Sequence, residues 1–226
     1  MWDYGKFSVV TIVNYMLYVK ADTFILSAFW GPVQVAVYNS VKVFIRVYDM
    51  VAQVAQMFVF PAASKLSSQG DLSSLKKLLE KAVAFTTVAL IPVFILFLFL
   101  SPVMIKIIYA DRYGEAILLL QIFSVLCFVA PIIAVASNTL LGLGHARLSS
   151  FLSFKTLLGS LVAYMVLIPW LGPLGATIGY VISFGLQAWW FTRASNRYVP
   201  LTWRGIGSRT GDIWAFVESI ARKRLF

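Results

Sequence analysis

Long runs of apolar residues alternate with short polar breaks along most of the chain. About 20 mostly apolar residues are needed for a helix to cross a bilayer, and six stretches are long enough. They cover residues 7–30, 33–60, 82–100, 116–141, 151–170 and 174–191. Breaker residues separate them, at Gly31-Pro32, Pro61, Ser101-Pro102, Gly142 to Gly144 and Gly172-Pro173. The pattern predicts an all-α integral membrane protein with six transmembrane helices over residues 1–193.

Two features of these spans predict departures from straight helices. Pro92 and Pro131 lie inside the third and fourth spans, and proline removes one helical hydrogen bond, so we expect kinks there. The second span is the longest, with about 28 residues before Pro61, or about 40 Å of helix. We expect it to tilt in the bilayer or to project beyond it.

The overall composition agrees with a membrane protein. Of the 226 residues, 60% are hydrophobic and 12% are charged, and the mean hydropathy is +0.85, whereas soluble domains are about 25% charged. The chain has one cysteine, Cys127, and one histidine, His145, so it has neither an internal disulfide nor a His and Cys cluster for a metal. The sequence predicts no cofactor. It also contains no pair of acids in an arrangement suited to hydrolysis, so it predicts that the protein is not an enzyme.

The basic residues predict the orientation of the chain. Loops on the cytoplasmic side of a membrane are enriched in Lys and Arg. With six spans, fourteen of the 19 basic residues fall on one side, in the amino end, the second and fourth loops and the tail, whereas only Lys106 and Arg112 fall on the other. Both termini are therefore predicted to lie in the cytoplasm, at the inner membrane of the cell, and most of the net charge of +10 is explained without nucleic acid.

Two stretches on the basic side have the pattern of short interfacial helices. Residues 71–82 place Leu72, Leu75, Leu78 and Leu79 on one helical face, and residues 212–224, in a basic cytoplasmic tail that runs from 194 to 226, do the same with Ile213, Phe216, Val217 and Ile220. Such helices rest on anionic headgroups. Solvated faces with ordinary topology signals are an equal alternative.

Five charged residues lie inside the first two spans, where they need a special environment. Lys20 and Asp22 are in the first span, and Lys42, Arg46 and Asp49 share one face of the second at i, i+4 and i+7. A charge at bilayer depth costs roughly 2.5 to 3.5 kcal/mol, so these side chains are predicted to face a bundle interior or a wet cavity. A positive cavity suits an anionic substrate such as a phosphate. The alternative is that the charges pair with one another and only hold helices together.

Short motifs in this order resemble a known family of exporters. Gly31, Val35 and Tyr38 form a G-x-x-x-V-x-x-Y pattern, and Pro61, Ser64, Lys65 and Leu66 form P-x-x-S-K-L. Tyr113, Ala116 and Leu120 follow, then Gly144 and Arg147, then Pro169, Gly172, Gly175 and Ala176. The set resembles the carboxyl-terminal half of a polysaccharide biosynthesis flippase, of the O-antigen (Wzx) type, in the multidrug/oligosaccharidyl-lipid/polysaccharide exporter superfamily.

This resemblance implies a fold, a function and a partner. Family members have two six-helix lobes around a central, cationic cavity that alternates its opening, and they turn undecaprenyl-pyrophosphate-linked oligosaccharides across the cytoplasmic membrane. Lys20, Lys42 and Arg46 would then attract the anionic substrate, with Asp22 and Asp49 as their partners or as a coupling site. The resemblance covers one lobe, so it implies a second, supplied by an amino-terminal half, a partner chain or another copy.

Two other functions remain open at this stage. One is a drug or lipid exporter of the same superfamily, although a positive cavity is a poor match for cationic drugs. The other is a membrane subunit that does not transport and instead scaffolds a glycan assembly complex. Binding of a lipid-linked oligosaccharide that depends on the intramembrane cations would separate the flippase from the scaffold.

Overall fold

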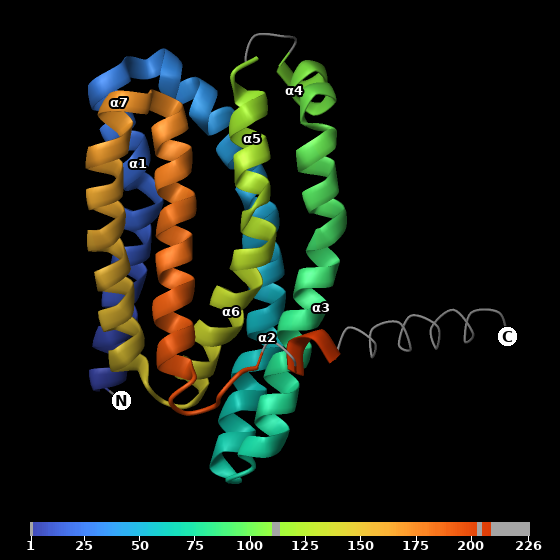
Figure 1. The fold of residues 1–226 in the computed structure, drawn as a ribbon. Coiled ribbons are helices and arrows are strands. Elements are labelled where there is room, and N and C mark those ends of the chain that lie inside the picture. The colour runs from blue at the N-terminus through green and yellow to red at the C-terminus, as the bar shows by residue number, and fades with distance from the viewer. Residues whose placement is uncertain (1, 110–113, 203–204, 209–226) are drawn as a thin grey trace, which may run out of the picture.

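The computed structural model describes residues 2–109, 114–202 and 205–208, and these residues are helical with no strand. The helices are α1 (Trp2–Lys42), η1 (Val43–Ile45), α2 (Arg46–Ser68), α3 (Leu72–Phe99), α4 (Ser101–Tyr109), α5 (Ala116–Ser124), α6 (Leu126–Gly142) and α7 (Ala146–Ser195). They form an up-and-down bundle in which the start of α1 and the end of α7 lie at the same end (Figure 1). Within the described residues, three helices are long and apolar enough to cross a membrane, or four if the bent pair α5 and α6 forms one span.

The breaks predicted at two Gly-Pro pairs are confirmed. Gly31 divides α1 and Gly172 divides α7, and both have the positive φ angles, 76° and 55°, that glycine adopts without a Cβ penalty. The chain reverses direction near the top of both helices in Figure 1. The two reversals touch, because the indole Nε1 of Trp30 donates to the Ile168 carbonyl at 2.8 Å.

The second predicted span, residues 33–60, differs from the prediction in its interior and at its carboxyl end. A 3-10 turn, η1, interrupts the helix at Val43–Ile45, and α2 then continues through Pro61 to Ser68. Pro61 therefore does not end the helix. α6 packs closely over this turn, because a Cβ on Gly142 would lie 2.7 Å from the Ala63 Cβ and 3.0 Å from the Phe60 carbonyl oxygen. Small residues allow such an approach between membrane helices.

The prediction of a separate interfacial helix at residues 71–82 is wrong. This segment is the first part of α3, which runs without a break from Leu72 to Phe99. Leu75 and Leu79 are fully buried and pack with Val59 and Ala63 of α2. Because a partner helix covers the leucine face, that face does not rest on headgroups. The other predicted interfacial helix, residues 212–224, lies outside the described residues.

The bend in the fourth predicted span does not lie at Pro131. The helix axis turns by 46° between α5 and α6, at Val125. Around this break the backbone makes tighter i to i+3 hydrogen bonds, from Val125 N to Ile122 O and from Phe128 N to Val125 O. Pro131 lies within α6, six residues after this break.

Packing of α1 on α7 and of α2 on α6 builds the core. The main apolar cluster takes its buried side chains mostly from α1, α3, α5, α6 and both halves of α7. The stripe of Gly175, Gly179 and Ser183 is buried, and a Cβ on Gly179 would lie 2.8 Å from the Tyr164 ring in the first half of α7. These small residues, four apart on one helical face, therefore let the two halves of α7 pack closely.

Candidate functional site

A buried ion pair joins the two parts of α1 on either side of Gly31. The Lys42 Nζ atom lies 2.7 Å from Asp22 Oδ1 and 2.6 Å from Asp22 Oδ2. The Asp22 side chain is completely buried. Asp22 precedes Gly31 by nine residues and Lys42 follows it by eleven, so the chain reversal at Gly31 places the two residues at the same level of the bundle.

All the strong donors and acceptors of this pair are satisfied. The Tyr38 hydroxyl donates to Asp22 Oδ2 at 2.5 Å, and the backbone N–H of Thr23 donates to Oδ1 at 2.6 Å. The ammonium also donates to the Val19 carbonyl at 2.6 Å, so its three N–H groups meet three acceptors. A buried charge pair is tolerated when hydrogen bonds complete it in this way.

Aromatic rings complete the surroundings of the Lys42 ammonium. Its Nζ atom lies 5.3 Å from the centre of the Tyr38 ring and 5.5 Å from that of Tyr180, distances at which a ring face attracts a cation. Tyr180 comes from the second half of α7, and its ring stacks on Phe184 with centroids 4.8 Å apart. Lys42 is therefore held between α1 and α7.

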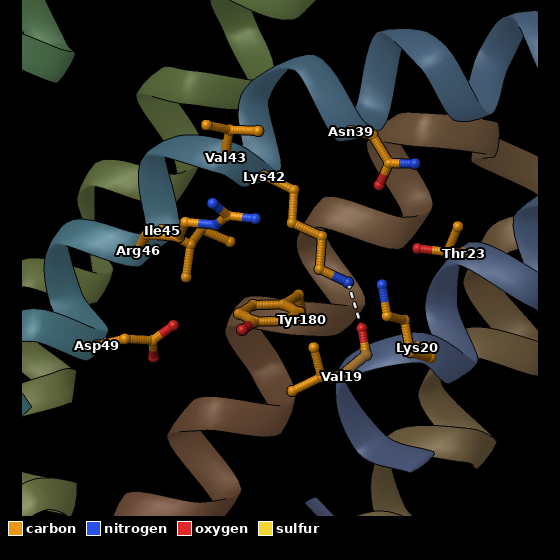
Figure 2. Close-up of a pocket in the computed structure, with 10 residues that line it drawn as sticks. All are labelled: Val19, Lys20, Thr23, Asn39, Lys42, Val43, Ile45, Arg46, Asp49 and Tyr180. Carbon is orange, nitrogen blue, oxygen red and sulfur yellow. Dashed lines mark hydrogen bonds between the residues drawn. The ribbon is translucent and has the colours of Figure 1, made fainter. Parts of the chain in front are cut away.

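A cavity of about 300 Å³ lies beside the ion pair. Figure 2 shows the residues that line it, which come from α1, η1, α2 and α7: Val19, Lys20, Thr23, Asn39, Lys42, Val43, Ile45, Arg46, Asp49 and Tyr180. Arg46 and Asp49 lie on the first turn of α2, and Lys20 lies on α1 across the cavity from them (Figure 2). Side chains from four helical segments thus line a polar cavity that is large enough for a phosphate group.

The five predicted site residues are brought together, but they do not share one role. Lys20, Lys42, Arg46 and Asp49 line the cavity, while Asp22 lies behind it under Lys42. Lys20 and Arg46 are exposed to the cavity, and neither forms an ion pair within 4.0 Å among the described residues. Arg46 and Asp49, which the alternative of mutually paired charges could join, therefore form no ion pair within 4.0 Å.

The charges leave the site positive. Three cations and two carboxylates meet here, and Asp22 neutralises Lys42. Asp49 remains to face Lys20 and Arg46, which leaves one positive charge in excess. The site has the cationic character that the sequence predicts, although its available cations are Lys20 and Arg46 and not Lys42.

Sequence reasoning missed three side chains of the site. Tyr38 lies four residues before Lys42 on the same helical face, which was a usable signal. Thr23 follows Asp22 and caps its carboxylate locally. Tyr180 lies 138 residues beyond Lys42, and no local pattern shows that α7 brings it to this cavity. No group of three or more His, Cys, Asp or Glu side chains suited to a metal occurs in the part of the chain that the structure describes.

Comparisons with known proteins agree with this membrane fold. Residues 1–118 match a family of polysaccharide biosynthesis proteins, which is more than half of the chain. The protein belongs to this polysaccharide biosynthesis family. It is a multi-pass membrane protein, and its family includes flippases of the Wzx type.

Three relatives are similar to this protein over most of the chain. A membrane protein of Methanocaldococcus jannaschii is 24% identical over 85% of the chain. A protein of Haloferax volcanii named a probable low-salt glycan biosynthesis flippase is 20% identical over 83%, and a protein of Shigella flexneri that bears the name of an O-antigen transporter is 23% identical over 88%. The matches cover 39%, 40% and 48% of these relatives, so the chain spans less than half of their length. No solved structure matches the chain.

Proposed function

We propose that the chain is one lobe of a flippase that moves lipid-linked, anionic oligosaccharides across the cytoplasmic membrane. The observation that carries this proposal is a cavity lined by two cations, Lys20 and Arg46. Neither of them forms an ion pair with a carboxylate within 4.0 Å among the described residues. A guanidinium and an ammonium are well matched to a phosphate. The relatives named as a glycan flippase and an O-antigen transporter support a glycan as the cargo. The family resemblance implies that this glycan is lipid-linked, with undecaprenyl pyrophosphate as its carrier.

Six membrane passages fit this lobe. The segments Met16–Ser68 and Ala146–Ser195 contain 53 and 50 residues, or about 75 to 80 Å of helix, far more than a hydrocarbon core of about 30 Å. Each reverses at a glycine, Gly31 or Gly172, so each supplies two passages. With α3 and the bent pair α5 and α6, the lobe has six. Its more basic end, which carries Lys65, Lys76 and Lys77, then faces the cytoplasm with both termini.

The second lobe of the transporter is part of the proposal. The chain spans less than half the length of its relatives. We infer that the cavity at Lys20 and Arg46 is one wall of a larger pathway and that another six-helix unit, in the same polypeptide, in a partner or in a second copy, supplies the other wall.

Binding of a polyprenyl-diphosphate-linked sugar to the purified chain tests the proposal. We expect Lys20→Gln and Arg46→Gln each to weaken binding about tenfold, since each removes one charge-assisted hydrogen bond to phosphate. Lys77→Gln, which removes an exposed charge at the basic end, is the matched control and is expected to leave binding unchanged. The uncharged polyprenol with the same chain length reports the contribution of the lipid alone.

The other candidate functions give different outcomes in the same assay. A scaffolding subunit would bind the lipid-linked sugar no better than it binds polyprenol. An exporter of cationic drugs would bind a lipophilic cation more tightly when Lys20 and Arg46 are neutralised. Equal binding by Lys20→Gln, Arg46→Gln and the unmodified chain would rule out the proposed role of the cavity.

A further inference from the structure

A second cavity, of about 500 Å³, lies between α6 and the second half of α7. Its lining is Ile132, Ala188, Trp189, Thr192, Arg193 and Asn196, none of which lines the cavity at Lys42. All except Ile132 lie in or directly after the last two turns of α7, at the end of the bundle where α1 starts (Figure 1). No acidic side chain lines this cavity.

The Thr192 hydroxyl differs from those of the buried helical threonines because it forms no hydrogen bond among the described residues. Buried helical threonines of this chain donate to the carbonyl four residues earlier, as Thr139 does to Val135 at 2.7 Å, Thr156 to Leu152 at 2.9 Å and Thr177 to Pro173 at 2.9 Å. The Thr192 Oγ1 atom is buried and has no hydrogen-bond partner among the described residues. A buried hydroxyl without a partner costs free energy, so a ligand that accepts from it would be favoured.

Two further donors stand beside this hydroxyl. The Asn196 Oδ1 atom accepts from the Leu201 backbone N–H at 3.0 Å, which fixes the amide and leaves its Nδ2 group as a donor at the cavity. The Arg193 guanidinium lies over the Trp189 ring, 5.5 Å from its centre, and this contact holds the cation at the cavity edge. The residues that carry a hydroxyl, a guanidinium and an amide thus all line this cavity and span about one turn of helix.

The other part of the cavity is apolar, with Ile132, Ala188 and the Trp189 ring. We propose that this cavity binds an anionic phospholipid of the leaflet at the basic end, with its phosphate at Thr192, Arg193 and Asn196 and an acyl chain against Ile132 and Trp189. A single guanidinium with two neutral donors matches one phosphate, and the apolar lining matches the chain attached to it. The site is separate from the proposed transport cavity, so it stands whether or not the chain moves glycans.

Native mass spectrometry of the purified chain tests this site, with phosphatidylglycerol as the probe and phosphatidylcholine of the same acyl chains as the zwitterionic comparison. Arg193→Gln is expected to lower phosphatidylglycerol affinity about tenfold and Thr192→Val about threefold, as expected for the loss of a charged and a neutral hydrogen bond. Arg197→Gln removes an exposed charge four residues further along and is expected to leave the affinity unchanged.

Each result decides for or against the site. Equal losses in Arg193→Gln and Arg197→Gln would mean that phosphatidylglycerol senses only the general positive charge, and this would overturn the proposal. Tighter Arg193-dependent binding of polyprenyl monophosphate than of phosphatidylglycerol would also overturn it, by making the cavity a substrate site. If Arg193→Gln melts earlier because it loses the Trp189 contact, Thr192→Val, which is isosteric, decides alone.

Discussion

The indole of Trp30 lies against Gly172, so the reversal in α1 packs directly on the reversal in α7. A Cβ on Gly172 would lie 3.0 to 3.3 Å from three atoms of the Trp30 ring system. The Ile168 carbonyl, four residues before Gly172, accepts from Trp30 Nε1 at 2.8 Å. One side chain therefore supports both turns.

Gly172→Ala is expected to lower the stability of the protein by about 1 to 3 kcal/mol, because φ is 55° there and the added methyl would press on Trp30. Gly185→Ala is the matched control: nothing lies within 4 Å of its added methyl, and alanine favours a helix by up to about 1 kcal/mol. Thermal unfolding in detergent measures both. Equal melting temperatures for the two variants would contradict the packing described here.

The buried pair predicts a non-additive mutant cycle. Removal of one partner of such a pair costs about 3 to 5 kcal/mol, since it leaves a charge buried without compensation. Lys42→Met and Asp22→Asn should each destabilise the chain strongly, and the double variant should recover part of the loss because it leaves no unpaired charge. Unfolding of the three variants measures the coupling, and additive losses would show that the two side chains do not act as a pair.

Stability should separate Lys42 from the other two cations of the cavity. Lys42 has three acceptors, whereas Lys20 and Arg46 form no ion pair within 4.0 Å among the described residues. We expect Lys20→Gln and Arg46→Gln to melt close to the unmodified chain, with changes within about 0.5 kcal/mol. Either variant melting as early as Lys42→Met would assign that cation a structural role.

The contact between α6 and α2 predicts that Gly142 tolerates little change. Gly142→Val would place its methyl groups against Ala63 and the Phe60 carbonyl, and overpacking of this kind costs about 1 to 3 kcal/mol. Gly114→Ala, where a Cβ meets nothing within 4 Å, is the control. A destabilised Gly142 variant with an unchanged Gly114 variant in thermal unfolding is the expected pair of results.

The segment after α7 is held by a buried carboxylate. Glu80 of α3 is 4% exposed and accepts from the Thr202 hydroxyl at 2.8 Å and from the Thr202 backbone N–H at 3.3 Å. Glu80→Ala should therefore raise the hydrogen-exchange rate of the Leu201 and Thr202 amides. Glu80→Gln should leave that rate close to its value in the unmodified chain, since the glutamine amide oxygen still accepts. Slow exchange in Glu80→Ala would show that packing of Val199 and Leu201 is sufficient.

The proposed topology can be measured by labelling of single cysteines in sealed vesicles. Cys127 is buried and should react slowly. Ser73→Cys, in the first turn of α3 at the basic end, should react from the cytoplasmic side. Ile107→Cys, whose native side chain is 77% exposed on α4, should react from the outside. Labelling of both positions from the same side would contradict an orientation with both termini in the cytoplasm.

The sequence by itself determined the features that depend on local composition. Apolar runs of about 20 residues predict membrane helices wherever they occur. The breaks at Gly31 and Gly172 were predictable because glycine followed by proline cannot continue an α-helix undisturbed. The clustering of Lys20, Asp22, Lys42, Arg46 and Asp49 was predictable too, since the cost of burying charge in lipid drives such side chains together.

Only the tertiary structure decided how these charges are used and where helices continue. Helical spacing places Lys42, Arg46 and Asp49 on one face, but the reversal at Gly31 brings Asp22 to Lys42 and leaves Arg46 without a carboxylate at ion-pair distance. The leucines of residues 71–82 have the same pattern on a membrane surface as in a helix pair, and α2 settles the choice by burying Leu75 and Leu79. Local sequence sets which groups must be buried or paired, whereas the partner of each depends on which distant helix the fold brings within a few ångströms.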